Sequence, residues 1–393
     1  MKHSAKLLFA GDVCFDVQPE VDATLSRRIL AGVKPYFEAA DLRILNLETP
    51  LADEGVGAPI PKSGPNIVGR PRNLAFLREA GADCAVLANN HAKDYGEEAL
   101  LATMRLLDEN GISHCGAGRD VEEAYRAWRA ERNGIRFSLI AVCENEFGVA
   151  GVGRSGTAGF RWERLAAKIA EERDAADFVI VQFHGGNEFN PVPSPGARER
   201  YRLILRLGAD AVVGGHPHCI QGFEFVGGRP IVYSLGNFLF KDSPPRSCDD
   251  PWHYGYLAEL TATKGERLSL RAIPYRFDPD ATFVEPFEGE ERERMLAYID
   301  RLSAIIPDDA RLVALYNAWC SIKGVDYVRG LQAKPEYFAP GRRPADFAGL
   351  RDLLSCEAHN ELLRTTLDIA FSGELEEAIA NRGKILELQR MPV

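Results

Sequence analysis

The sequence lacks any long apolar run. None of its segments approaches the roughly 20 apolar residues that a membrane-spanning helix needs. The apolar run from Leu7 to Ala10 meets Gly11-Asp12 at once, so it is too short for a signal peptide and is typical of a first buried strand. The sequence therefore predicts a cytoplasmic protein with no integral membrane segment.

Paired cysteines and an excess of positive charge are also missing. The eight cysteines are scattered and form no C-x-x-C pair, which in a chain of 393 residues favours reduced, mostly buried thiols over a disulfide framework. Lys plus Arg number 47 against 57 Asp plus Glu, a net charge of −10. Proteins that bind nucleic acid through its phosphates usually have the opposite balance, so we predict no nucleic-acid partner.

The chain is long enough for two or three domains, and its character changes near residue 285. Up to there, short apolar runs alternate with amphipathic stretches, the pattern of an α/β domain. Beyond it, residues 290–306, 309–322, 344–366 and 373–389 predict helices, with a Pro- and Gly-containing stretch at 334–343. We predict an α/β domain over 1–284 and a helical C-terminal extension over 285–393. The extension contains one histidine, His359, and no metal-like cluster, so packing or contact with a protein partner is its predicted role.

One short unit occurs four times in the α/β region. A helix ends at a small residue, an aspartate (Asp41, Asp83, Asp177 or Asp210) opens a short apolar strand, and a polar loop follows. The first Asn or His comes five to seven residues after each aspartate. Since the carboxyl ends of parallel strands face one crevice, we expect the loops to converge at one edge of one sheet, together with Asp12 from the first strand. The converging residues are Asp12, Asn46, Glu48, Asn90, His91, His184, His216 and His218.

Later segments predict short antiparallel strands at 223–226, 230–233, 256–261 and 268–273. These strands are expected to complete a second sheet.

The converging side chains suit metal ions. Three histidines, two carboxylates and one or two amides exceed the needs of one tetrahedral zinc site. They suit two adjacent divalent ions that share an oxygen ligand, which together can activate water and hold a phosphoryl group. Ligands of nitrogen and oxygen without thiolate favour Mn, Fe, Zn or Ni.

Each residue alone has a simpler interpretation. Asp12 could cap a helix, Asn89-Asn90 could form a turn, and a lone histidine at a strand end is commonly structural. The shared position at five strand ends favours the metal site. His114 has an ambiguous position at the end of another strand, whereas His3, His253 and His359 are expected on the surface or in packing. Arg70, Arg72 and Arg198 are candidates for pairing with substrate anions, although solvated arginines are commoner.

Six ordered motifs over about residues 5–275 resemble those of the bacterial capsule-synthesis CapA-type family, part of the calcineurin-like metallophosphoesterase superfamily. The motifs are Gly11-Asp12, Asn46-Leu47-Glu48, Asn89-Asn90-His91 with Asp94 and Gly96, His184 to Glu188, Gly215-His216-Pro217-His218, and Ser234 to Phe238.

The resemblance implies a four-layer α/β/β/α sandwich with two mixed sheets around a dinuclear metal centre. It implies metal ligands at Asp12, Glu48 (bridging), Asn90, His184, His216 and His218, and makes His91 the residue at the phosphate or leaving group. Asn46, Asn89, Glu188 and Asn237 would contact the substrate or support the ligands. The sequence departs from the pattern in two places. Cys14 replaces the histidine of a D-x-H motif, and Gly185-Gly186 stands where a tryptophan is usual.

The resemblance favours a metal-dependent phosphoester hydrolase linked to the synthesis of a capsule, a polysaccharide or poly-γ-glutamate. Its substrate would be a small anion or a capsular polymer. One alternative is an amide-bond hydrolase or transferase acting on a γ-glutamyl substrate, because the same metals can polarise a carbonyl. Another is a non-catalytic protein of capsule assembly that binds the polymer.

Overall fold

The computed structural model describes residues 3–18, 20–331, 341 and 344–392. The predicted stretch 334–343 lies outside the described residues except for Gly341. No helix in these ranges is both long and apolar enough to cross a bilayer. None of the eight cysteines is in a disulfide, and all except Cys248 are buried.

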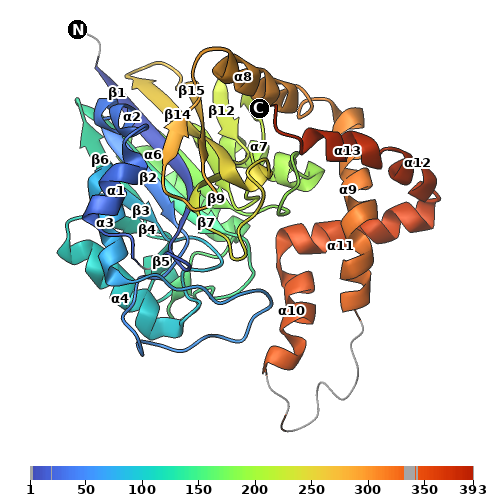
Figure 1. The fold of residues 1–393 in the computed structure, drawn as a ribbon, viewed down its shortest axis with the longest axis horizontal. Helices are drawn as coiled ribbons and strands as arrows, with labels where there is room; N and C mark the ends of the chain where they lie inside the picture. Colours follow the sequence, from blue (N-terminus) through green and yellow to red (C-terminus); the bar gives the residue numbers. More distant parts are fainter. Residues whose placement is uncertain (1–2, 19, 332–340, 342–343, 393) are drawn as a thin grey trace.

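Within the described residues, two large mixed sheets face each other (Figure 1). The first runs β16-β15-β14-β1-β2-β3-β4, with β13 beside the end of β1. Its strands β1 to β4 and β13 are mutually parallel, and β14 to β16 are antiparallel. Their bounds are β1 Ser4–Cys14, β2 Leu42–Leu47, β3 Cys84–Val86, β4 Ser113–Cys115, β13 Asn237–Phe240, β14 Tyr254–Thr263, β15 Ser269–Phe277 and β16 Val284–Pro286.

The second sheet runs β11-β12-β10-β9-β7-β6, with parallel strands at its centre and antiparallel strands at both edges. Its strands are β6 Trp128–Arg132, β7 Ile135–Cys143, β9 Phe178–His184, β10 Ala211–Gly215, β11 Phe223–Val226 and β12 Arg229–Val232; β5 Ala117–Gly118 and β8 Gly156–Thr157 pair separately. Of the predicted antiparallel strands, only β11 and β12 belong to this sheet. The antiparallel strands predicted at 256–261 and 268–273 are present as β14 and β15, but their assignment to the second sheet was wrong, because they extend the first sheet beside β1.

The apolar residues form a four-layer α/β/β/α sandwich. One core lies between the sheets, with Phe9 and Ile44 from the first and Leu139 and Ile180 from the second. A second core packs helices α1 Ala23–Leu30, α2 Lys34–Ala39, α3 Leu74–Ala80 and α4 Gly96–Glu109 on the outer face of the first sheet. A third packs α5 Val121–Ala124, α6 Trp162–Ala175 and α7 Pro195–Arg206 on the second.

The four repeated aspartates fasten neighbouring parallel strands together at their amino ends. The backbone N–H of Asp83 donates to the carbonyl of Arg43, and Oδ2 of Asp83 accepts from the Arg43 N–H, both at 2.9 Å. The same reciprocal pair of bonds joins Asp41 to Lys6, Asp177 to Arg136 and Asp210 to Val179. Because these bonds fix the strand register at one end, the polar loops leave the opposite ends side by side.

Helices α8 Gly289–Ser303, α9 Asp309–Gly330, α10 Ala348–Ser355, α11 Glu357–Ser372, α12 Leu375–Ala380 and α13 Arg382–Leu388 follow the sheets. Most of them form the orange and red group beside the sandwich in Figure 1, and the end of the chain returns to α8. The predicted helix 344–366 is interrupted at Cys356, whose backbone is extended, and 373–389 divides at Asn381. Tyr298 and Trp319 of these helices belong to an apolar cluster that is continuous with the core between the sheets. The division at residues 284 and 285 stays a prediction.

Candidate metal centre

The predicted site residues come together, but from both sheets. Asp12 and Asn46 lie on β1 and β2, Glu48 follows β2, and Asn90 and His91 follow β3. His184 ends β9, and His216 and His218 follow β10 of the other sheet. The expectation of one edge of one sheet was therefore wrong. The strand pattern predicts polar carboxyl ends, but it carries no information about which sheet each strand joins.

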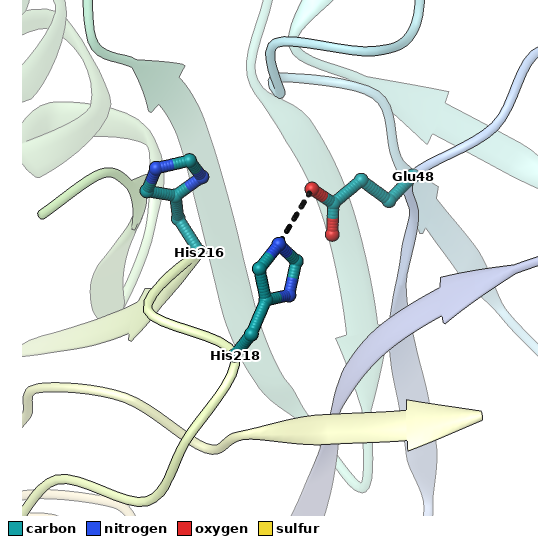
Figure 2. Close-up of side chains that lie close together, drawn as sticks. All are labelled: Glu48, His216 and His218. Carbon is teal, nitrogen blue, oxygen red and sulfur yellow. Dashed lines mark ion pairs between the residues drawn. The ribbon is translucent and has the colours of Figure 1, made fainter. Parts of the chain in front are cut away.

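Glu48 belongs to two groups of candidate ligands, and Figure 2 shows its carboxylate facing His218, with His216 nearby. Its Oε1 is 3.3 Å from Nε2 of His184 and 3.9 Å from Nε2 of His218. The side chain is fully buried, and neither carboxylate oxygen has a hydrogen-bond partner among the described residues. Two sets of candidate ligands share Glu48, one with Asp12 and His184 and the other with His216 and His218. A buried carboxylate without donors is costly, and one or more divalent cations would relieve that cost.

Nε2 of His184 is surrounded by other potential metal ligands. Oδ1 of Asn90 lies 3.1 Å away and Nδ1 of His216 lies 3.2 Å away. Burial lowers the pKa of His184 to about 4 and, with the neighbouring histidines, lowers the pKa of His216 well below its ordinary value. Both rings are therefore neutral near pH 7, the state in which imidazole binds metals. These donors fit a divalent ion bound by nitrogen and oxygen.

Asparagines hold the ligand side chains in place. Nδ2 of Asn46 donates to Oδ1 of Asp12 at 2.7 Å and contacts Nδ1 of His184 at 3.2 Å. Asn89 in turn donates to Oδ1 of Asn46 at 3.1 Å. Oδ1 of Asn237 lies 2.8 Å from Nδ1 of His218. Such contacts fix the orientation of side chains that bind metals.

Burial disfavours the charged carboxylates of Asp12 and Glu48 where no cation is bound. Burial, and then the charge of Glu48, raises the pKa of Asp12. Burial also raises the pKa of Glu48, whereas His218 and His91 lower it and the exposed Glu188 raises it. Cations at this position would favour the charged forms of both buried carboxylates.

The backbone is strained where the second sheet supplies its ligands. His216 and His218 have φ of 97° and 54°, in the region that residues other than glycine rarely occupy. The backbone N–H of His216 donates to Oδ2 of Asp12 at 3.1 Å, which ties the strained turn to the first sheet. Strain of this kind persists where the surrounding structure imposes it, and it clusters at functional sites.

His91 lies at the end of a buried chain of polar contacts. Its Nδ1 is 2.7 Å from Oδ2 of Asp94, whose Oδ1 accepts from Lys62 at 2.7 Å. The side chains of Lys62 and Asp94 are 2% and 0% exposed. Sequence reasoning missed Lys62, because it lies in a long loop without periodicity.

Sequence reasoning also missed Glu144 and Glu146, although the strand-end argument could have found them, since both follow β7. Oε1 of Glu146 lies 3.6 Å from Nε2 of His216. The statement that the C-terminal extension has no metal-like cluster was wrong, because Cys356 and His359 form one with Glu146 of the sandwich.

Other predicted residues lie elsewhere. Arg198 is buried against the carbonyl of Ile306 (2.9 Å) and Asp309 (2.6 Å), so it joins α7 to the C-terminal region rather than facing a substrate. Arg70 and Arg72 line a separate surface pocket that also contains Glu20, Asp53 and Glu54. His114 pairs with Asp108, His3 bonds to Asn133, and His253 packs on Phe277.

The sequence matches known families. A family model described as "Bacterial capsule synthesis protein PGA_cap" matches residues 6–242. "Capsule biosynthesis protein CapA" of Bacillus anthracis is 28% identical over 228 residues, which cover 56% of this chain and 56% of that protein. "PGA biosynthesis protein CapA" of Bacillus subtilis (strain 168) is 28% identical over 258 residues, or 61% of this chain and 64% of that protein. The chain thus spans less than two thirds of the length of either relative.

Solved structures give weaker likenesses. One described as a novel phosphatase of Mycoplasma pneumoniae covers 72% of this chain and 97% of its own, at 15% identity and a TM-score of 0.46. A putative 5'-nucleotidase from Staphylococcus aureus covers 76% of this chain and 58% of its own, at 15% identity and a TM-score of 0.43. Likeness at this level assigns no activity.

Proposed function

We propose, from the premise that this chain belongs to the bacterial capsule synthesis protein PGA_cap family, that it is a metal-dependent hydrolase of phosphoesters in the synthesis of a capsular or polyglutamate-type polymer. The observation that carries the proposal is Glu48, a buried carboxylate without hydrogen-bond donors that two sets of candidate ligands share.

The ligands of this proposal are Asp12, Glu48, Asn90, His184, His216 and His218. Two divalent ions held there, from among Mn, Fe, Zn and Ni, would lower the pKa of water and balance the charge of a phosphoryl group. Asn46, Asn89 and Asn237 keep the ligand side chains in position. Glu188, at the exposed margin, faces the approaching substrate.

His91 is the proposed general acid. In phosphoester hydrolysis a water oxygen loses a proton to solvent and bonds to phosphorus, the bond from phosphorus to the leaving oxygen breaks, and the leaving oxygen takes a proton from the general acid, which solvent then reprotonates. Asp94 engages Nδ1 of His91, which leaves Nε2 as the ring nitrogen that can deliver this proton. Lys62 donates to Oδ1 of Asp94 at 2.7 Å and so holds that carboxylate in its orientation toward His91.

A pocket lined by residues close in sequence to His91 and Glu146 favours an anionic substrate. It has a volume of about 320 Å³ and is lined in part by Lys93, Phe147, Arg154 and Arg351. Lys93 follows His91 by two residues, and Arg351 donates to the backbone carbonyl of Glu146. None of its lining residues in the described chain is acidic. Three cationic side chains suit a phosphate or carboxylate group that extends from the reacting bond.

The test begins with elemental analysis and a phosphoester assay. Metal-free protein is reconstituted with Mn²⁺, Fe²⁺, Zn²⁺ or Ni²⁺ and assayed with p-nitrophenyl phosphate and bis-p-nitrophenyl phosphate. We expect metal-dependent turnover by the wild type, lost together with bound metal in His216→Gln and His218→Gln. His114→Gln, a histidine outside the site, is the matched control and should keep both. His91→Gln should keep the metal and lose about 10²–10⁴-fold in kcat.

The names of the relatives favour one second candidate. "PGA biosynthesis protein CapA" and a "Probable polyglutamine synthesis accessory protein" of Mycobacterium tuberculosis both refer to glutamyl or related polymers. The same metals could polarise an amide carbonyl. Release of p-nitroaniline from γ-glutamyl-p-nitroanilide, without phosphoester turnover, would favour this candidate. Turnover of neither substrate class with any of the metals would contradict both and leave a non-catalytic role in capsule assembly.

A further inference from the structure

The C-terminal helices bring metal-binding side chains to the edge of the candidate centre. Helix α10 ends at Ser355, Cys356 has an extended backbone, and α11 begins at Glu357. Glu357 accepts from the backbone N–H of Asn145 at 2.9 Å and from its side chain at 2.6 Å. This contact holds the break between the helices against the loop that follows β7.

At this break, Glu146, Cys356 and His359 meet. Each offers one ligand atom, and these atoms all lie within 4.8 Å of one another. Sγ of Cys356 is 3.8 Å from Oε1 of Glu146, and the thiol is fully buried. Cys356 is the residue that caps the start of α11 and His359 lies in the first turn of this helix, so both side chains are at the same end of α11.

The surrounding charges favour a cation here. Cys356 also contacts the carboxylate of Glu144 at 3.4 Å, and Asp352 lies 3.1 Å from Nδ1 of His359. Among the described residues, neither Glu146 nor Asp352 forms an ion pair with a lysine or an arginine, although both are less than 10% exposed. Oδ1 of Asp352 and Nε2 of His216 are buried and have no hydrogen-bond partner in the same part of the chain. Asp352 is paired with the imidazole of His359, so Glu146 is the acid of this cluster without a cationic partner among the residues described, and such a buried acid is costly unless a metal ion or a proton neutralises it.

We propose that Glu146, Cys356 and His359 bind a further divalent cation of the zinc type, next to the centre that Glu48 shares. Thiolate, imidazole and carboxylate together are typical zinc ligands, and three of them leave one position open. Asp352 would orient the ring of His359, as carboxylates commonly do for ligating histidines. The proposal does not depend on the hydrolase activity.

Glu146 would connect the two sites. Its Oε1 is 3.6 Å from Nε2 of His216, whose Nδ1 points at His184 in the first centre. A cation bound to Glu146 would therefore lie close to His216, and its charge would act on a side chain that also contacts His184. The C-terminal extension would then supply two of the three ligands of this further metal site.

Cobalt provides a test that separates this site from the first one. A cobalt–thiolate bond gives a charge-transfer absorption in the near ultraviolet, and the proposed ligands around Glu48 include no thiolate. We titrate metal-free, full-length protein with Co²⁺ under reducing conditions and expect this band in the wild type, with Zn²⁺ removing it by displacement. The band should disappear in Cys356→Ser and persist in Cys320→Ser, the matched control for a buried cysteine of the same helical region.

A second variant guards against misfolding of Cys356→Ser. Glu146→Gln keeps every cysteine and should weaken Co²⁺ binding at this site at least tenfold, seen as a higher Co²⁺ concentration at half-maximal band intensity. Circular dichroism confirms that each variant is folded. A wild type without the band, or a band of equal strength in Cys356→Ser, would overturn the proposal. Cobalt bound without any thiolate band would support only the centre around Glu48.

Discussion

Replacing Glu48 with glutamine should change protein stability in opposite directions with and without metal. Glutamine has nearly the shape of glutamate but no charge, and its amide can donate to Nε2 of His184, which lies 3.3 Å from the present Oε1. In metal-free protein, the variant removes a buried carboxylate that lacks donors. We expect the free energy of unfolding to rise by about 1 kcal/mol, the usual size for a gained buried hydrogen bond.

With metal the order reverses. A ligand at 100 times its dissociation constant stabilises the folded protein by about 2.7 kcal/mol, provided that it binds the folded state alone. Glu48→Gln should lose this stabilisation, because both sets of candidate ligands share the carboxylate. The variant should then be less stable than the wild type by about 2 kcal/mol, the difference between the two effects.

Urea unfolding measures both quantities. Each protein is unfolded with a chelator and then with Mn²⁺ at 100 times the dissociation constant that calorimetry gives for the wild type. Glu172→Gln is the matched control, because Glu172 is equally buried but accepts bonds from Arg129 (2.7 Å) and Ser138 (2.8 Å). It should be destabilised to the same extent in both conditions. If Glu48→Gln behaves like this control, Glu48 is a structural carboxylate and the reasoning fails.

Three other predictions concern contacts that stabilise the fold. Gly11→Ala would put Cβ 1.9 Å from the carbonyl oxygen of Gly236, so it should lower the free energy of unfolding measured in urea by roughly 1–3 kcal/mol. Because Asp12 is the next residue, the variant should also bind metal more weakly. Unchanged metal affinity would refute this connection between Gly11 and the candidate centre. Asp210→Ala removes the acceptor for the Val179 N–H and should cost about 1–3 kcal/mol, whereas Asp210→Asn keeps an acceptor oxygen and should cost less; equal losses would count against the strand-fastening role. The hydrogen bonds from Arg129 and Ser138 outweigh burial and lower the pKa of Glu172, so the stability that it contributes is present above the unfolded-state pKa and is lost as pH falls through the folded-state value. The stability difference between wild type and Glu172→Gln should therefore be full at pH 7 and shrink below about pH 4.5, and a difference constant down to pH 3 would contradict this.

Much of the candidate centre could be predicted because each candidate ligand lies close to the carboxyl end of a strand of strong apolar character. Asp12, His184 and His216 stand at or just after the carboxyl ends of β1, β9 and β10. A strand that ends in a polar residue is a local pattern, visible without knowledge of the fold. The same pattern holds for Glu146, three residues after β7, so that residue was predictable although it was not predicted.

Other features could not be predicted from local pattern. Arg198 reads as a free cation at the start of a helix, but it is buried against the start of α9. Lys62 carries no periodic signal, and its meeting with Asp94 depends on the path of a long loop. Strands β14 and β15 have the pattern of any antiparallel pair. Such a pattern shows which side chains of a strand are buried, but it does not show which sheet the strand joins.

The sequence by itself determined the α/β class, the absence of long apolar spans, the strand-opening aspartates and the chemical types of the converging ligands, because these depend on residues close together in the chain. Only the tertiary structure decided that the candidate ligands come from two sheets, that two sets of them share Glu48, and that Cys356 and His359 meet Glu146 across 210 residues of chain. The physical reason is that strand order and helix docking follow from burying apolar faces against one another over the whole molecule, and no local stretch of sequence specifies its distant partner.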